Sequence, residues 1–368
     1  SVMKKYLEKN VYEALQDRLK FIFDNFDNIY VSFSGGKDSG LLLNMVLSYK
    51  RRNKIAKKIG VFHQDFEAQY QTTTDFVSRM FENNLRDIEP YWVCLPMGSR
   101  CAVSNYQMYW YPWDPDKEEL WVRPMPKMPY IINMDNNPFD FYRYKMVQED
   151  LYAEFGEWYS RQKKGKTICL LGIRADESLN RYRAYANDRK TIMQGNQWTT
   201  KMGENWWNAY PIYDWTTKDV WIANGKFDYD YNRIYDLFWK AGLSISQMRV
   251  ASPYHESAKE SLNLYRVLEP ATWVRVVSRV QGANFGAIYG SSHALGARKI
   301  ELPPGHTWRS YVKFLLATLP EAMRRNYIEK FKTSIRFWWK KGGVVDEEAI
   351  KELEACNYPI RHNGKSNY

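Results

Sequence analysis

Cysteine is scarce in this chain, which disfavours disulfide-stabilised folds and cysteine-rich metal sites. Only four cysteines occur among 368 residues, and no two of them form a C-x-x-C pair. They are too few and too scattered for a disulfide framework. Cys94 and Cys101 lie seven residues apart with no histidine or third cysteine nearby, so a shared metal site there is disfavoured.

Long apolar runs are also missing. No stretch approaches the roughly 20 consecutive apolar residues that a membrane-spanning helix requires. The polar N-terminal residues do not resemble a secretory signal peptide. With reduced thiols and no export signal, we expect a cytoplasmic protein without membrane association.

Positive charge and aromatic rings, by contrast, are abundant. The formal net charge is +11, and the chain contains 28 Tyr, 15 Trp and 17 Phe residues. The charge would attract phosphate-rich ligands or nucleic acid, although it would also serve solubility alone. Two interpretations explain the aromatic side chains. In the simpler one they fill the hydrophobic core, and in the second some of them stack on nucleobases. Composition by itself favours the core.

Strands and helices alternate along the first two-thirds of the sequence. Hydrophobic periodicity predicts helices over residues 3–26, 40–47, 72–84 and 144–161. Runs of β-branched and aromatic residues predict strands over residues 28–33, 58–63, 91–95 and 167–174. This alternation is typical of an α/β fold with a doubly wound, mostly parallel sheet.

The domain organisation follows from where this alternation begins, breaks and ends. We predict an N-terminal helix over residues 1–27 and a nucleotide-binding α/β domain over residues 28–245. A Pro- and Trp-rich insertion interrupts that domain at about residues 98–140, and ordered insertions of this size usually carry function. The remaining residues, 246–368, form a helical, basic and aromatic-rich C-terminal region.

The strongest chemical signal lies where the first strand ends and a buried helix begins. The segment consists of Ser34, Gly35, Gly36, Lys37, Asp38 and Ser39. Two glycines let the backbone turn tightly against an anion, and the helix N-terminus, the hydroxyls and the lysine add positive charge and donors. A plain glycine turn is the alternative, but five fixed positions arise by chance on the order of once in a million windows. The spacing of a Walker A loop is absent.

The Ser34–Ser39 segment resembles the PP-loop of the ATP pyrophosphatase superfamily, whose members release pyrophosphate while adenylating a substrate. Three later segments narrow the resemblance to the phosphoadenylylsulfate (PAPS) reductase-like branch. They are F-H-Q-D-F-E at 62–67, L-G-I-R-A-D-E-S-L-N-R at 171–181 and P-I-Y-D-W-T-T-K-D-V-W at 211–221. The resemblance covers roughly residues 28–250 and implies an adenine nucleotide α-hydrolase-like fold.

More closely, the chain is similar to the IbrA-type subgroup of that branch. The similarity includes the helix before the loop, W-V-C-L-P at 92–96 and W-D-P at 113–115. Members of the subgroup are typically encoded beside a ParB-like protein and are linked to gene regulation. The resemblance therefore implies a ParB-like partner, which composition alone does not indicate.

The resemblance implies ATP as the substrate, with the Ser34–Ser39 segment holding its pyrophosphate and Asp65 facing the adenosine. Lys37, Asp38 and Arg174 are the candidate catalytic residues. Arg174 ends a buried strand at the carboxyl edge of the sheet, where open α/β folds bind ligands, and a guanidinium there grips phosphate oxygens. The alternative for Arg174 is a structural ion pair with Asp176 or Glu177.

Three further assignments stay open at this point. Arg181 lies seven residues after Arg174 and shares its face if the segment is helical. Asp38 and Asp65 end neighbouring strands and together suit Mg²⁺ on the ATP, since that ion takes one or two carboxylates plus phosphate oxygens. Asp65 alternatively accepts from the ribose hydroxyls, and Asp38 alternatively caps a helix that starts at Ser39.

The chain departs from the reductases of the branch in one respect. Those enzymes carry a reactive cysteine in a C-terminal E-C-G-x-H segment, and the C-terminal part here offers only Cys356, without an adjacent Gly or His. Glu352 and Glu354 nearby would raise the pKa of the Cys356 thiol. We therefore predict that the protein is not a true PAPS reductase.

The C-terminal region has helical periodicity from residue 308 to 341 and an excess of bases. Between residues 301 and 341 nine Lys or Arg stand against three Glu, with aromatic residues interleaved. The pattern suits a nucleic-acid strand, but an amphipathic helical layer packed on the α/β core produces it too.

Two functional hypotheses follow. One is an adenylating enzyme, with DNA sulfur modification as one use. The other is a nucleotide-sensing regulatory module that acts on DNA with a ParB-like partner.

Overall fold

The computed structural model describes residues 7–187, 189–245, 247–255, 262–283, 302–340, 361–362 and 366–367. The chain divides into two compact units. The first unit contains residues 1–99, 111–253 and 264–275, and the second contains residues 100–110, 254–263 and 276–368. The domain boundary at residue 245 stays a prediction.

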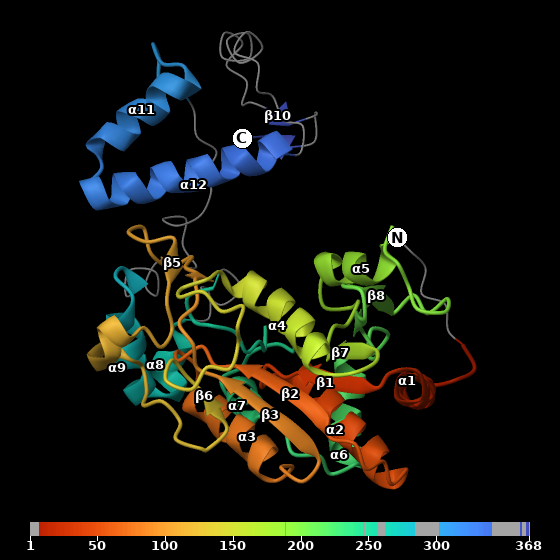
Figure 1. Ribbon diagram of the computed structural model, residues 1–368. Helices are drawn as coiled ribbons and strands as arrows, with labels where there is room; N and C mark the ends of the chain where they lie inside the picture. The colour runs from red at the N-terminus through yellow and green to blue at the C-terminus, as the bar shows by residue number, and fades with distance from the viewer. Residues whose placement is uncertain are drawn as a thin grey trace. The chain divides into compact units, whose positions relative to one another are not determined.

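The first unit is built on a seven-stranded sheet with the order β6-β3-β2-β1-β7-β9-β8 (Figure 1). Neighbouring strands are parallel except β8 and β9, which are antiparallel. This confirms the predicted α/β class and its mostly parallel sheet. The strands are β1 (Asn28–Ser32), β2 (Ile59–Gln64), β3 (Ile88–Val93), β6 (Ile131–Ile132), β7 (Thr167–Leu171), β8 (Thr199–Lys201) and β9 (Trp206–Ala209).

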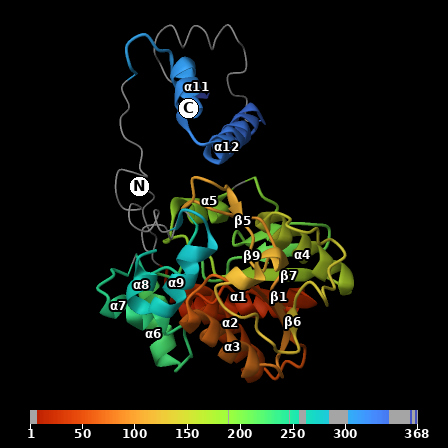
Figure 2. The ribbon, with the colours of Figure 1, turned by 90° about the vertical axis from the view of Figure 1, so that its left-hand side faces the viewer.

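Helices cover both faces of the sheet, as Figures 1 and 2 show for α2 and α3 on one side and α4 on the other. Apolar residues of α1, α2, α3 and α6 form one buried cluster with β1, β2 and β7, and those of α4 form a second cluster on the opposite face. The helices are α1 (Val11–Asn25), α2 (Lys37–Arg52), α3 (Gln71–Glu82), α4 (Gln148–Gln162), α5 (Leu179–Ala186), α6 (Thr217–Lys226), α7 (Ile234–Lys240), α8 (Leu264–Leu268) and α9 (Pro270–Arg279), with a short 3₁₀ helix at Pro115–Leu120.

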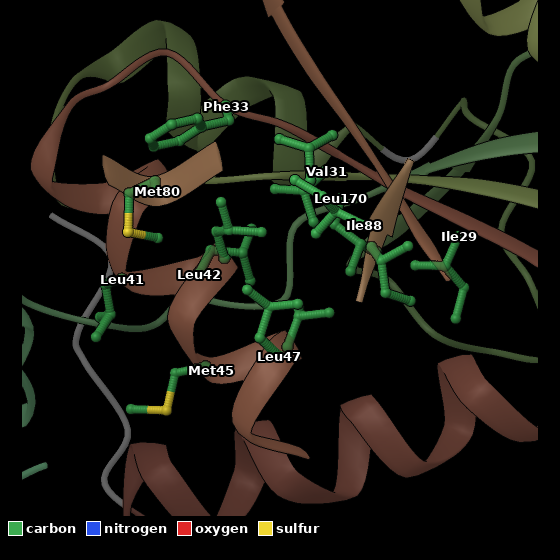
Figure 3. Packing of buried hydrophobic residues seen from close by; sticks show 14 of the residues in the cluster. Ile29, Val31, Phe33, Leu41, Leu42, Met45, Leu47, Met80, Ile88 and Leu170 are labelled. Carbon is green, nitrogen blue, oxygen red and sulfur yellow. The ribbon is translucent and has the colours of Figure 1, made fainter. Parts of the chain in front are cut away.

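The larger cluster explains why α2 lies firmly against the sheet. Leu42 and Leu47 of α2 pack with Val31 of β1 and Leu170 of β7 (Figure 3), and all four are at most 1% exposed. Burying side chains of this size contributes about 1.5–3 kcal/mol each. The N-terminus of α2 is therefore held in a fixed place at the carboxyl edge of the sheet.

The predicted bounds of several helices needed correction, as for α4, which begins at Gln148 and not at residue 144. Helix α1 begins at Val11, because Asn10 and Glu13 form a capping box there. Helix α2 begins at Lys37 with Gly36 as N-cap and without a side-chain cap, so the alternative that Asp38 caps a helix starting at Ser39 is wrong. Lys37, Asp38 and Ser39 instead lie in the first helical turn.

The second unit contains α11 (Trp308–Thr318) and α12 (Glu321–Lys340), where the sequence predicted one continuous helical stretch. The break falls at Leu319 and Pro320, since proline lacks the amide hydrogen that the helix interior requires. The other elements outside the main sheet are the strand pair β4 (Ser99–Arg100) with β5 (Tyr109–Trp110) and the pair β10 (Arg361–His362) with β11 (Ser366–Asn367). Among the described helices, none has the length and apolar character needed to cross a membrane.

Candidate functional site

The turn from β1 into α2 forms a tight loop, and serine hydroxyls within the loop form hydrogen bonds that hold it together. Gly35 has a φ of +78°, a backbone conformation that glycine adopts without strain. The Oγ atoms of Ser34 and Ser39 lie 2.9 Å apart, and the Gly36 N–H donates to Ser34 Oγ over 3.3 Å. The loop thus places hydroxyls and backbone N–H groups at the positive end of α2, which is an arrangement suited to binding an anion.

Two glycines let neighbouring elements approach this loop closely. A Cβ on Gly35 would lie 2.9 Å from Cγ2 of Val77 on α3. A Cβ on Gly172, just after β7, would lie 2.8 Å from the backbone nitrogen of Ser39. Real Cβ atoms do not approach a backbone nitrogen so closely, so β7 and α2 fit together only because residue 172 is glycine.

Arg174 and Asp38 form the buried ion pair of the site. The Arg174 Nε donates to Asp38 Oδ1 over 2.8 Å, and the Lys37 Nζ lies 3.2 Å from Asp38 Oδ2. Arg174 is only 2% exposed, and its other nitrogens donate to the Trp215 carbonyl and the Thr217 hydroxyl. The structure therefore brings three sequence-predicted residues together.

One of the two acidic residues that the alternative interpretation offered as partners of Arg174 pairs with a different arginine. Glu177 forms an ion pair with Arg181 at 2.7 Å, and Arg181 lies on α5 with 40% of its side chain exposed. Ser178 caps that helix by accepting from the Arg181 N–H. Arg174 is thus paired with the loop itself, through Asp38.

Asp65 lies after β2 and is fully buried in a network that the Pro- and Trp-rich insertion provides. Its carboxylate forms an ion pair with Arg123 and accepts from the Trp92 indole N–H over 2.8 Å and the Glu67 N–H over 2.8 Å. Trp113 donates its indole N–H to the Asp65 carbonyl. Burial raises the pKa of Asp65, but the charges of Arg123 and His63 and the hydrogen bonds from Arg123 and Glu67 together outweigh burial, so the net pKa lies below its ordinary value.

Glu67 and His63 complete the buried polar layer beside Asp65. Glu67 is 0% exposed and accepts from the backbone N–H groups of Trp113 and Val122, which ties the insertion to the end of β2. His63 Nδ1 lies 2.8 Å from the Phe33 carbonyl, and burial lowers the pKa of its imidazole. A neutral structural histidine is the role that this surrounding supports.

Two residues that sequence reasoning missed come from the segment before and within α7. The Asn232 Nδ2 donates to the Gly35 carbonyl over 2.9 Å and to the Thr73 hydroxyl over 2.8 Å. The Tyr235 hydroxyl accepts from the Lys37 N–H over 3.0 Å. No local motif marks either residue, because their importance arises only from folding back onto a loop nearly 200 positions earlier.

A neighbouring helix start is also capped from far along the chain. Helix α3 has no side-chain cap at Tyr70. Instead Glu269 accepts from the Gln71 and Thr72 N–H groups over 2.7 and 3.1 Å. Tyr70 stacks on Tyr265 with ring centroids 3.8 Å apart, which fixes α8 against the same corner of the first unit.

Asp38 and Asp65 are the predicted Mg²⁺ ligands. Each carboxylate forms an ion pair with an arginine, Asp38 with Arg174 and Asp65 with Arg123, and their role as Mg²⁺ ligands stays a prediction. Within the described ranges, no group of three or more His, Cys, Asp and Glu side chains is arranged to hold a metal ion. Cys94 and Cys101 are both buried, and Cys356 lies outside the described residues.

Known proteins similar to this chain include one that matches nearly all of it. A family model described as "Domain of unknown function (DUF3440)" matches residues 242–368. The Escherichia coli (strain K12) protein described as "Uncharacterized protein YbdN" is 35% identical over 364 residues, which covers 98% of this chain and 87% of that protein.

Solved structures are similar only at low scores. PAPS reductase from Candida auris is 13% identical to this chain. The match covers 64% of this chain and 93% of the reductase, with a TM-score of 0.32. NMN synthetase from Francisella tularensis is 11% identical, with coverages of 82% and 100% and a TM-score of 0.32. Candida glabrata FMN adenylyltransferase with FMN and an ATP analog is 14% identical, with coverages of 63% and 63% and a TM-score of 0.35. Scores this low say nothing about the function of this chain.

Proposed function

This chain belongs to the family of the Escherichia coli protein YbdN, and we propose that it is an ATP pyrophosphatase or adenylyltransferase. It transfers the AMP group of ATP to an acceptor and releases pyrophosphate, and free AMP forms when the activated acceptor reacts further or is hydrolysed. The observation that carries the proposal is the turn from β1 into α2, where Gly35, Lys37 and Ser39 form an anion cradle at a buried helix start. The order of the PP-loop, PAPS reductase-like and IbrA-type segments in the sequence supports the same proposal.

The proposed step is the attack of an acceptor oxygen on the α-phosphorus of ATP. The bond from that phosphorus to the oxygen bridging the α- and β-phosphates breaks, and its electron pair leaves with pyrophosphate. Negative charge therefore grows on the leaving group. The positive end of α2 and the Lys37 ammonium stabilise that charge, and groups fixed in advance do so without reorganising.

The other candidate residues act around this cradle. Arg174 holds Asp38, and Asp38 holds the Lys37 ammonium in place beside the loop. Asp65 serves the adenosine side, where it accepts from the Glu67 N–H, and Arg181 of α5 adds positive charge for binding the nucleotide. Mg²⁺ accompanies ATP in this proposal, and Asp38 and Asp65 are the carboxylates that would help to hold it, since the ion takes one or two carboxylates plus phosphate oxygens.

The proposal predicts that Lys37→Ala impairs nucleotide handling while the protein stays folded. Losing one charged hydrogen bond costs about 1.5–3 kcal/mol, which corresponds to an affinity or kcat/KM about 10- to 100-fold lower. Products of α-labelled ATP with Mg²⁺ are identified by chromatography, and titration with α,β-methylene-ATP measures binding without turnover. Lys20→Ala, an exposed lysine on α1, is the matched control. Formation of ADP in place of AMP, or wild-type behaviour of Lys37→Ala, contradicts the proposal.

A second candidate function is a nucleotide-sensing module that acts on DNA with a ParB-like partner. The specific observation in its favour is the helix pair α11 and α12. Residues 302–337 contain seven Lys or Arg and two Glu. Phe314, Phe331 and Phe337 on these helices are 54%, 42% and 51% exposed. Exposed rings beside bases suit single-stranded nucleic acid, and a DNA acceptor for the adenylating enzyme would use the same surface.

Replacing Lys330, Lys332 and Arg336 together by Ala tests this surface. If it binds single-stranded DNA, the slope of log affinity against log salt becomes shallower by about 0.7 for each phosphate that the variant no longer neutralises. Fluorescence titrations of labelled oligonucleotides at several salt concentrations measure the slope, and ATP cleavage should not change. An identical slope for the triple variant and the wild type would exclude α12 as the nucleic-acid surface.

A further inference from the structure

Tyr235 brings a buried phenol to the start of α2. Tyr235 lies on α7 and is 4% exposed. Its hydroxyl oxygen accepts a hydrogen bond from the Lys37 N–H, one of the backbone donors at this helix start that have no partner within the helix. A Cβ on Gly36 would lie 3.5 Å from the same oxygen. The phenol therefore stands directly over the glycine turn, at the point where an anion would bind.

The hydrogen atom of this phenol has no acceptor in the part of the chain that the structure describes. A tyrosine hydroxyl both accepts and donates one hydrogen bond. The Tyr235 oxygen accepts from Lys37, and among the described residues no acceptor takes its hydrogen. Burial raises the pKa of Tyr235 well above its ordinary value, so the hydrogen is present throughout the neutral range. Leaving a buried donor without an acceptor is unfavourable, so we expect a bound ligand to supply the acceptor.

The phenol is also held in a fixed position. The Tyr235 ring packs edge-on against Trp221 and Phe238, with centroids 5.3 and 5.9 Å away. Three residues earlier, Asn232 grips the Gly35 carbonyl and Thr73. The Lys37 ammonium lies 5.7 Å from the centre of the same ring. Ring, loop and lysine thus keep one geometry, as a preorganised binding group requires.

We propose that the Tyr235 hydroxyl donates a hydrogen bond to the pyrophosphate group bound at the Ser34–Ser39 loop. This inference rests on the proposed function, because it assigns a further contact to the same ligand. Two other roles are distinguishable from it. If Tyr235 only anchors α7 to the loop, its hydroxyl affects stability but not affinity. If it only occupies the Lys37 N–H in competition with the ligand, its removal strengthens binding.

Tyr235→Phe removes the hydroxyl and keeps the ring packing. Isothermal titration of inorganic pyrophosphate into the full-length protein should show affinity about 10- to 100-fold weaker than wild type, as expected for one hydrogen bond to a charged group. Tyr231→Phe is the matched control, since the Tyr231 hydroxyl donates to Asp236 Oδ1 over 2.9 Å and should leave affinity unchanged. Melting temperatures of both variants separate a loss of folding from a loss of binding.

Each outcome decides the matter. Equal or tighter binding by Tyr235→Phe overturns the inference and leaves the proposed function standing. Absence of pyrophosphate binding by the wild type overturns both. If Tyr235→Phe melts below the titration temperature, 3-fluorotyrosine at position 235 replaces it. The fluorine resonance then shifts on adding pyrophosphate if the contact forms, and a resonance that does not move overturns the inference.

Discussion

Arg123→Met is expected to lower the free energy of unfolding by about 3–5 kcal/mol, because it leaves the buried Asp65 carboxylate without its cation. Asp65 is 0% exposed, and the Arg123 side chain is 8% exposed, so water cannot replace the missing charge. Urea denaturation at neutral pH measures the change. Arg143→Met, which breaks the exposed pair with Glu154, is the control and should unfold like the wild type.

The same variant has an expected pH dependence. In the wild type the pKa of Asp65 is lower in the folded state than in the unfolded state. Ionised Asp65 therefore contributes fully to the free energy of unfolding at pH values above its unfolded-state pKa. This contribution is lost as the pH falls through the folded-state pKa. Without Arg123, only His63 and the hydrogen bonds from Glu67 and Trp92 oppose the effect of burial, so that pKa rises. The stability gap between wild type and variant therefore narrows as pH falls and Asp65 is protonated in the variant. A gap that is constant from neutral to acidic pH would rule out the buried charge as its cause.

A double variant separates the effect of charge from the effect of packing. Asp65→Asn together with Arg123→Met removes both charges, and buried pairs replaced in this way often lose little stability. We expect the double variant to recover part of what Arg123→Met alone loses. If it is no more stable than Arg123→Met, the packing of the Arg123 side chain matters more than its charge.

Gly172→Ala is expected to reduce nucleotide turnover about 100-fold, since displacing a catalytic group by about 1 Å has an effect of that size. The new Cβ would lie 2.8 Å from the backbone nitrogen of Ser39, so the start of α2 or the end of β7 must move. Overpacking of this kind also lowers stability by about 1–3 kcal/mol. Steady-state kinetics and urea denaturation measure the two effects.

The control for this variant is Gly225→Ala within α6. A Cβ on Gly225 meets nothing within 4 Å, so no neighbour has to move. Alanine also favours a helix over glycine by about 1 kcal/mol, so this variant should be as stable as the wild type or slightly more so. If Gly172→Ala keeps full turnover, the close contact between β7 and α2 is not what positions the loop.

The regular part of the fold could be predicted from the sequence because its signals are local. The strand at 28–32, the glycine turn and the apolar helix after it follow each other within 25 residues. Their order predicts a parallel sheet with the loop at its carboxyl edge, and the structure confirms that sheet. The short strands β6, β8 and β9 were missed, since runs of two to four residues carry too little periodicity.

The contacts that shape the site could not be predicted, because they join distant segments. Asp65 was expected to face a ligand, yet its carboxylate is taken by Arg123, which lies 58 positions later in the insertion. Nothing near either residue indicates this pairing. Arg174 likewise meets Asp38 across 136 positions, although acidic residues closer in sequence offered simpler partners. Sequence spacing identifies residue types, whereas tertiary packing selects the partners.

The remote contacts at the two helix starts have a consequence for the order in which a ribosome delivers the chain. Tyr235 is synthesised 198 residues after Lys37, and Glu269 is synthesised 198 residues after Gln71. At 5–20 residues per second, this interval lasts roughly 10–40 s. During that time the nascent chain contains the whole loop sequence but neither residue that completes these helix starts. A nascent fragment that ends before Tyr235 therefore has the loop sequence without its finished geometry, and nucleotide binding is expected only late in synthesis.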